Sequence, residues 1–221
     1  MSIRSWVIKQ LQKEFHSSHS SIQSIGENGV RVTRLGRPDA TGYCVEPDGS
    51  PFTAPMLDEA IAELPEVGMV IVTRRVVDAD VYSRALELGV CVETFGGFSR
   101  AVTFLDDISS YMHPEEEYFR RRISRTRIVS SVSRRGHRAW ELQRINGLRP
   151  LTVVTHDRYE LTDEGFAGVL DQYPGIDIDA LVITNPSAQG FGKRVVTSAR
   201  EANIPLYKLD DFIGKIRERW T

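Results

Sequence analysis

The sequence predicts two tandem α/β units, each a small sheet with helices on its faces. Two observations carry this prediction. Runs rich in β-branched residues alternate with amphipathic runs of helical length, an order typical of strands joined by helical crossovers. In addition, the pattern of residues 43–53 recurs without a gap in residues 152–162. A chain of 221 residues is long enough for two domains of about 100 residues each.

The repeat covers most of both halves as a match of residue pattern. Leu64-Pro65 aligns with Tyr173-Pro174, residues 69–73 align with 181–184, and residues 88–98 align with 202–212. An internal repeat of this kind indicates a duplicated unit. We therefore expect one α/β unit over residues 1–111 and a second over residues 112–221.

The elements follow from local patterns taken in chain order. Residues 1–15 predict an amphipathic helix. Strands are expected near residues 30–35, 42–46, 68–73 and 90–94, and near 138–144, 151–156, 179–184 and 204–208. Helices are expected over residues 56–65, 78–89, 162–174 and 192–203. Pro65 and Gly89 are stop signals, and Thr162 is a candidate cap. Residues 111–122 predict an exposed linker and helix start, and the alternation as a whole predicts parallel strands.

Composition and charge exclude several classes of protein. Hydrophobic residues make up 41% of the chain and charged residues 26%, which is typical of a globular protein. A net charge of −2 is too balanced for a chain that coats nucleic acid or a membrane with its whole surface. Cys44 and Cys91 lie in apolar runs, so we expect neither a disulfide framework nor a zinc site. The sequence has no membrane span or signal peptide pattern, and we expect a cytoplasmic protein without membrane contact.

Arginine is concentrated in one part of the chain. Ten arginines fall between positions 120 and 149, whereas the whole sequence has five lysines. Arginine presents a planar fork that matches phosphate and stacks on bases. We predict a nucleic-acid interface formed by Arg120, Arg121, Arg122, Arg125, Arg127, Arg134, Arg135 and Arg138. Two other interpretations stay open: a solvated helix whose arginines pair with Glu115, Glu116 and Glu117, or a surface for an acidic protein partner or a second copy.

The order helix, hairpin, helix, strand, helix, strand resembles the restriction-endonuclease-like superfamily, also called PD-(D/E)xK, in particular its Mrr-type branch. Residues 181–212 (LVITNPSAQGFGKRVVTSAREANIPLYKLDDF) carry the resemblance most clearly, and residues 69–98 carry it more loosely. The pattern is shared by many Rossmann-like domains. The resemblance implies a role in DNA restriction, repair or antiviral defence, as a subunit of a larger complex, with DNA as the expected nucleic acid rather than RNA.

Active members of that superfamily need an acidic residue followed on the next strand by an acid and a lysine one residue apart, which together hold Mg²⁺ and the attacking water. Neither half of this chain has the lysine. We therefore expect that catalysis has been lost and that no cofactor is needed. The alternative is an active Mg²⁺-dependent nuclease, with Asp39, Glu46, Asp48 and Asp157 as ligands, His156 or Arg158 replacing the lysine, and Glu141 as a further acid.

A loop between a predicted strand and a predicted helix is a candidate phosphate site. Gly190, Gly192, Lys193 and Arg194 lie there, where main-chain amides at a helix start favour an anion. The spacing is not that of a Walker A loop, and a tight turn that leads into a helix explains the glycines better than an anion site does. If the units are Rossmannoid nucleotide sensors instead, this loop and residues 73–75 would face the nucleotide. A third alternative is that the protein is a structural adaptor.

Overall fold

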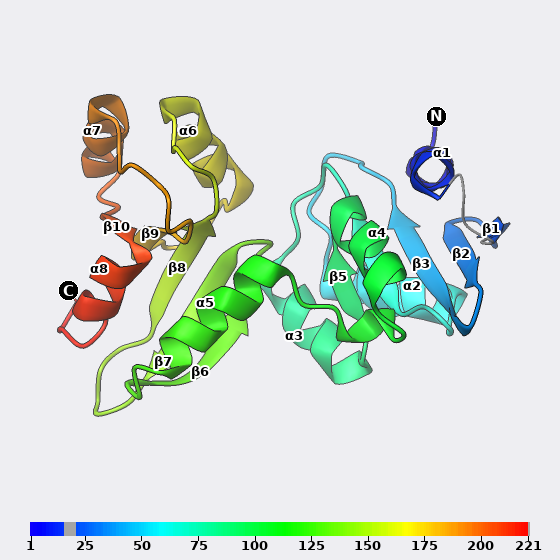
Figure 1. Ribbon diagram of the computed structural model, residues 1–221, viewed down its shortest axis with the longest axis horizontal. Coiled ribbons are helices and arrows are strands. Elements are labelled where there is room, and N and C mark those ends of the chain that lie inside the picture. Colours follow the sequence, from blue (N-terminus) through cyan, green and yellow to red (C-terminus); the bar gives the residue numbers. More distant parts are fainter. Residues whose placement is uncertain (16–20, 221) are drawn as a thin grey trace. The chain divides into compact units, whose positions relative to one another are not determined.

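The structure is a computed structural model that describes residues 1–15 and 21–220. The chain forms two compact units, Met1–Met112 and His113–Thr221 (Figure 1). The boundary expected from the repeat lies one residue from this division. Each unit is a mixed α/β sheet with helices on its faces, as the sequence predicts.

The described residues of the first unit form one five-stranded sheet of order β1-β2-β3-β4-β5. Strands β1, β2 and β3 are antiparallel, and β3, β4 and β5 are parallel. The elements are α1 (Ile3–Glu14), β1 (Ser21–Ile25), β2 (Gly29–Arg34), β3 (Arg37–Val45), α2 (Ala54–Glu63), β4 (Met69–Val72), α3 (Ala79–Leu88), β5 (Cys91–Glu93), α4 (Phe95–Phe104) and the 3-10 helix η1 (Ile108–Ser110).

The second unit repeats this order. Its described sheet has the order β10-β9-β8-β7-β6, antiparallel from β6 to β8 and parallel from β8 to β10. The elements are α5 (Pro114–Ser124), β6 (Val129–Arg134), β7 (Ala139–Arg144), β8 (Leu151–His156), α6 (Asp163–Gln172), β9 (Ala180–Ile183), α7 (Lys193–Glu201), β10 (Leu206–Lys208) and α8 (Leu209–Lys215).

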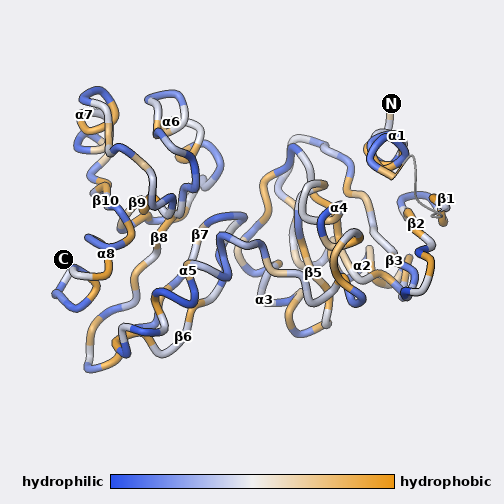
Figure 2. Tube along the Cα trace, viewed as in Figure 1, coloured by the Kyte–Doolittle hydropathy of each residue, from blue (hydrophilic) through white to orange (hydrophobic). Residues whose placement is uncertain are grey.

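Helices cover both faces of each sheet. In the first unit α1 and α4 pack on one face, and α2 and α3 pack on the other. In the second unit α5 and α8 share one face, and α6 and α7 share the other. Central strands are buried on both sides, and the helices alternate hydrophobic with hydrophilic residues, as α7 does in Figure 2. Cys44 and Cys91 are buried in strands β3 and β5 as free thiols.

Local sequence signals explain several helix ends. Pro114 opens α5, and His113 Nδ1 accepts a hydrogen bond from the Glu115 amide. Thr162 Oγ1 caps α6 by accepting from the Gly165 amide, 3.1 Å away. Gly89 ends α3 in the left-handed conformation, with φ 68°.

A buried arginine ends the second strand of the hairpin in each unit. Arg34 donates to the main-chain oxygens of Pro38, Val102, Leu105 and Asp106, the last three being at the end of α4. Arg144 donates to the oxygens of Arg149, Ile216 and Glu218, the last two being at the end of α8. Each side chain therefore binds the free carbonyls at the end of its unit's last helix.

The structure extends the predicted elements and corrects one of them. Each predicted strand corresponds to an observed one, but β1, β6, α4 and α8 were not predicted. The helix start expected within residues 111–122 is confirmed, because α5 begins at Pro114, but the segment is not an exposed linker, since Phe119 is fully buried. The strands are parallel only from β3 to β5 and from β8 to β10. Among the described residues, no helix is long and apolar enough to cross a membrane.

Candidate nucleic-acid interface

The predicted metal ligands of the first unit do not converge. Asp39 lies near the start of β3, and Glu46 follows its end. The two residues are seven positions apart along extended chain, so their Cα atoms lie about 23 Å from each other. Glu46 Oε1 instead accepts a hydrogen bond of 2.6 Å from the Ile3 amide at the start of α1. These two carboxylates are too far apart to bind one ion.

Asp48 shapes a turn. Its Oδ1 accepts hydrogen bonds from both the amide and the hydroxyl of Ser50. The same oxygen forms an ion pair of 2.9 Å with Arg75. The hydrogen bonds from Ser50 lower the pKa of Asp48. Arg75 also donates to the Glu46 and Ser50 carbonyl oxygens. The aspartate therefore stabilises the loop after β3.

The acids of the second unit are also dispersed. Glu141 pairs across the sheet with Thr152, five residues before the exposed Asp157. Its carboxylate forms an ion pair of 3.0 Å with Arg135. His156 is half-buried, and burial lowers its pKa, while Arg158 is exposed. Within residues 1–15 and 21–220, no three histidine, cysteine, aspartate or glutamate side chains are grouped to hold a metal.

A buried ion pair lies at the carboxyl end of β8 and β9. Glu115, in the first turn of α5, and Arg138, just before β7, approach to 2.8 Å, and their side chains are 5% and 15% exposed. Thr184, directly after β9, donates a hydrogen bond of 2.8 Å to the other oxygen of Glu115. Burial raises the pKa of Glu115, an effect that Arg138 and Thr184 oppose. The pair links α5 to the end of the parallel strands.

The corresponding position in the first unit is apolar. Helix α1 buries Ile3, Val7 and Leu11, and α5 buries Glu115, Phe119 and Ile123, in both cases at intervals of four residues. Ile3 and Glu115 therefore occupy equivalent sites on the first helix of each unit. The two units therefore differ here: the first has an apolar side chain where the second has an ion pair.

Five of the eight predicted nucleic-acid contacts are engaged within the second unit. Arg120 bonds Glu116 and the Val132 oxygen, Arg122 bonds Asp210 and Tyr118, Arg134 bonds the Gly136 oxygen, Arg135 pairs with Glu141, and Arg138 pairs with Glu115. Arg120 and Arg134 also lie over the Trp140 ring, at 5.5 and 6.0 Å from its centroid. Arg120 and Arg138 link α5 to the hairpin, Arg122 links α5 to α8, and Arg134 and Arg135 bond within the hairpin. These contacts reduce what the five side chains can offer a ligand.

The other three arginines are exposed at the end of α5. Arg121 lies over the Tyr118 ring, 5.7 Å from its centroid, and Arg125 and Arg127 follow in the loop. The exposed Arg217 joins them from the C-terminal segment, because its guanidinium donates to the Thr126 oxygen at 3.3 Å. We call Arg121, Arg125, Arg127 and Arg217 the basic patch. Among the described residues, no ion pair involves any of the four.

Within the described parts of the chain, no acid forms an ion pair with the basic patch, and the exposed Glu117 lies one turn before Arg121 on α5. Asp210 is bonded to Arg122, and Glu218 pairs with Lys215 at 2.9 Å. Four positive charges brought together from α5 and from a segment about 90 residues later suit successive phosphates of a nucleic acid. The sequence pointed to Arg121, Arg125 and Arg127 but missed Arg217. No local sequence pattern marks Arg217 as part of this surface, because its position depends on how Arg144 holds the end of α8.

The predicted phosphate loop lies between β9 and α7. Gly192 is the N-cap of α7, Lys193 and Arg194 are exposed in its first turn, and no acid lies in that turn. Gly190 has φ 123°, a conformation that favours glycine. In the first unit the equivalent helix α3 has an aspartate in its first turn. The phosphate site stays a prediction for the second unit alone.

No family model, curated protein or solved structure matches this chain.

Proposed function

We propose that the protein binds nucleic acid through the basic patch and does not cleave it. The observation that carries the proposal is the convergence, on one end of the second unit, of four exposed arginines that form no ion pair with any described acid. Each charge that meets a phosphate releases condensed counterions, so a local patch of this kind contributes affinity even when the whole chain is near neutral. The dispersed carboxylates of both units argue against a shared metal site.

The resemblance to the restriction-endonuclease-like superfamily supplies the setting of the proposal. On that basis the ligand is DNA in preference to RNA, the setting is cytoplasmic DNA restriction, repair or antiviral defence, and the protein acts as a subunit of a larger complex. The duplicated α/β order is compatible with this resemblance.

A charge-reversal variant tests the basic patch. Arg121→Glu combined with Arg127→Glu should weaken binding enough that a short DNA duplex no longer shifts in a gel at protein concentrations at which wild type shifts it. It should also make the slope of log affinity against log salt shallower by about 2, because each phosphate contact contributes roughly 0.9. An unchanged affinity would contradict the proposed surface.

The first unit offers a matched control. The exposed Arg100 lies over the Phe104 ring, 5.5 Å from its centroid. Arg121 lies over the Tyr118 ring in a similar way, at 5.7 Å. Arg74 is exposed with φ 60°, and Arg127 has φ 56°. Arg74→Glu combined with Arg100→Glu therefore makes the same change of charge in similar surroundings. We expect this control to bind DNA much more tightly than the patch variant.

The absence of cleavage is a separate prediction. Wild-type protein with Mg²⁺ or Mn²⁺ should leave labelled duplex and single-stranded DNA intact over hours, because no described carboxylates gather to hold the ion. Cleavage that Asp39→Ala or Glu46→Ala removes would show that the first unit assembles a metal site on binding DNA.

A further inference from the structure

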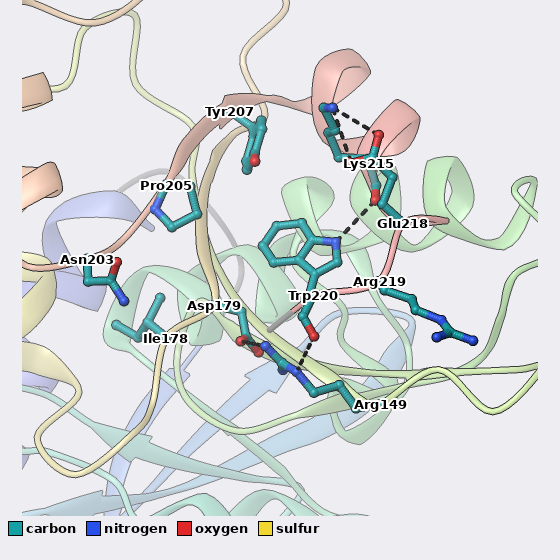
Figure 3. Close-up of a pocket in the computed structure, with 10 residues that line it drawn as sticks. All are labelled: Arg149, Ile178, Asp179, Asn203, Pro205, Tyr207, Lys215, Glu218, Arg219 and Trp220. Atoms are coloured by element: carbon teal, nitrogen blue, oxygen red, sulfur yellow. Dashed lines mark hydrogen bonds and ion pairs between the residues drawn. The ribbon is translucent and has the colours of Figure 1, made fainter.

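A pocket of about 350 Å³ opens beside Trp220 in the second unit (Figure 3). Ile178, Asn203 and Pro205 lie on one side of it, Trp220 lies opposite them, and Tyr207 lies above. The volume falls at the lower end of the range for pockets that hold small planar ligands. No part of the interface described above uses these side chains.

The Trp220 ring is held in place without a ligand. Its Nε1 donates a hydrogen bond of 3.1 Å to the Lys215 oxygen, and its own carbonyl oxygen accepts one of 3.2 Å from Arg149. The ring also contacts Tyr207 and Phe212, with centroids 5.9 and 6.1 Å away. A wall that is already ordered loses little conformational entropy when a ligand packs on it.

The charged groups of the pocket include two acid-base pairs and the exposed Arg219, whose additional positive charge suits the phosphate beside a base with donors and acceptors on its edge. Asp179 is compensated by Arg149 at 2.7 Å and by the Thr152 amide at 2.7 Å. Glu218 is compensated by Lys215. Asn203 is exposed at the rim, and its amide offers both a donor and an acceptor. An aromatic wall with an amide at the rim suits a nucleobase, which has a π-face and a hydrogen-bonding edge.

The pocket and the basic patch share one segment of chain. Arg217 belongs to the patch and Trp220 lines the pocket, and three residues span at most about 11 Å. We propose that the pocket takes one unstacked base of a single-stranded nucleic acid whose phosphates contact the basic patch. This inference rests on the proposed function and adds a preference for single strands, because bases inside a duplex are stacked and cannot enter.

Fluorescein-labelled oligothymidylate and a duplex of the same length are the probes, with affinity measured by anisotropy. Trp220→Ala should weaken binding of the single strand about 5-fold or more, the lower end of the effect of one stacked base, and leave binding of the duplex unchanged. Trp220→Phe keeps a ring and should restore most of the affinity. Binding should quench tryptophan emission in wild type and much less in Trp220→Phe. Trp6→Phe, in the first unit, is the control and should retain both the affinity and the quench.

The outcomes separate this inference from the proposed function. If Trp220→Ala binds the single strand as wild type does, while Arg121→Glu with Arg127→Glu still loses the duplex, the pocket assignment is overturned and the patch stands. If wild type binds neither probe, both fail. If circular dichroism shows that Trp220→Ala is unfolded, Asn203→Ala at the exposed rim provides the test instead. A loss of affinity for the single strand alone supports the pocket, and an unchanged affinity overturns it.

Discussion

Single residues with the same chemistry have different roles in this chain according to what surrounds them. Arg144 is 7% exposed and binds three main-chain oxygens, whereas Arg135 makes one surface ion pair with Glu141. Both belong to the arginine-rich segment that first suggested a ligand. Counting arginines in the sequence cannot separate them, because two of the three carbonyls that Arg144 binds come from residues about 70 positions later.

Arg144→Met should destabilise the second unit by about 2 kcal/mol or more. The substitution keeps much of the side-chain volume but leaves buried carbonyls without their charged donor. Arg135→Met removes only a partly exposed pair and should cost about 1 kcal/mol or less. Urea unfolding followed by circular dichroism measures both. Equal losses would mean that Arg144 has no special role at the end of α8.

The ion pair between Glu115 and Arg138 predicts strong coupling. Arg138→Met should cost about 3 kcal/mol or more, because it leaves a buried carboxylate without its partner. Adding Glu115→Ile, which copies the first unit, should recover most of that loss. The coupling energy is obtained from a double-mutant cycle. Additive losses would contradict the assignment of the pair.

The pH dependence of stability has a defined sign at Glu115. Burial raises its pKa above the ordinary value of 4.5, so the native state holds this proton more tightly than the unfolded chain. The resulting stability is present below pH 4.5 and is lost as the pH rises through the native pKa. Glu115→Gln does not titrate. Its unfolding free energy relative to wild type should therefore increase as the pH rises above 4.5. A relative decrease would contradict the raised pKa.

Whole elements show where sequence patterns fail. Strands β1 (SIQSI) and β6 (VSSVSR) are rich in serine and contain no fully buried residue, so they lack the apolar run that marks a buried strand. Helix α4 opens with Phe-Gly-Gly, a poor helix signal, yet Gly97 is required there because a Cβ would lie 2.9 Å from Glu93. Helix α8 is short and begins with Leu-Asp-Asp. In each case tertiary packing, rather than local propensity, stabilises the element.

The repeat supplies a matched pair of helix caps. Thr162 and Thr53 precede α6 and α2, and only the Thr162 hydroxyl accepts a cap hydrogen bond. Thr162→Ala should cost about 1 kcal/mol, and Thr53→Ala should cost less than half as much. Denaturant unfolding of the two variants measures the difference. A larger loss at Thr53 would contradict the cap geometry.

For the whole molecule, the division into two units with separate hydrophobic clusters predicts two unfolding transitions. Gly42→Ala should lower one of them, because its Cβ would lie 2.8 Å from Phe98 in the core of the first unit. Arg144→Met should lower the other. At about 4 to 8 °C per kcal/mol for domains of this size, calorimetry resolves both shifts. A single transition that both variants shift would show that the units unfold together.

The two-unit α/β architecture could be predicted because it depends on patterns that recur along the chain. Buried strands such as β4 and β9 consist of continuous apolar runs, and the repeat aligns them. The candidate site was harder to predict. The acids singled out in the sequence lie on one strand or in a turn, and a side chain from the end of the chain completes the basic patch. Proximity in space, which sequence spacing does not report, decides such sites.

Both cysteines are buried, which protects their thiols from reagents in solution. Cys44 is 1% exposed, and burial raises its pKa to about 12, so almost no thiolate is present at neutral pH; Cys91 is 8% exposed. Wild type should therefore react slowly with maleimide dyes. Cysteines introduced at the exposed positions Arg74 and Arg100 would then carry dyes without removal of the native thiols. An acceptor dye on an oligonucleotide would report by energy transfer how far bound DNA extends from the second unit to the first.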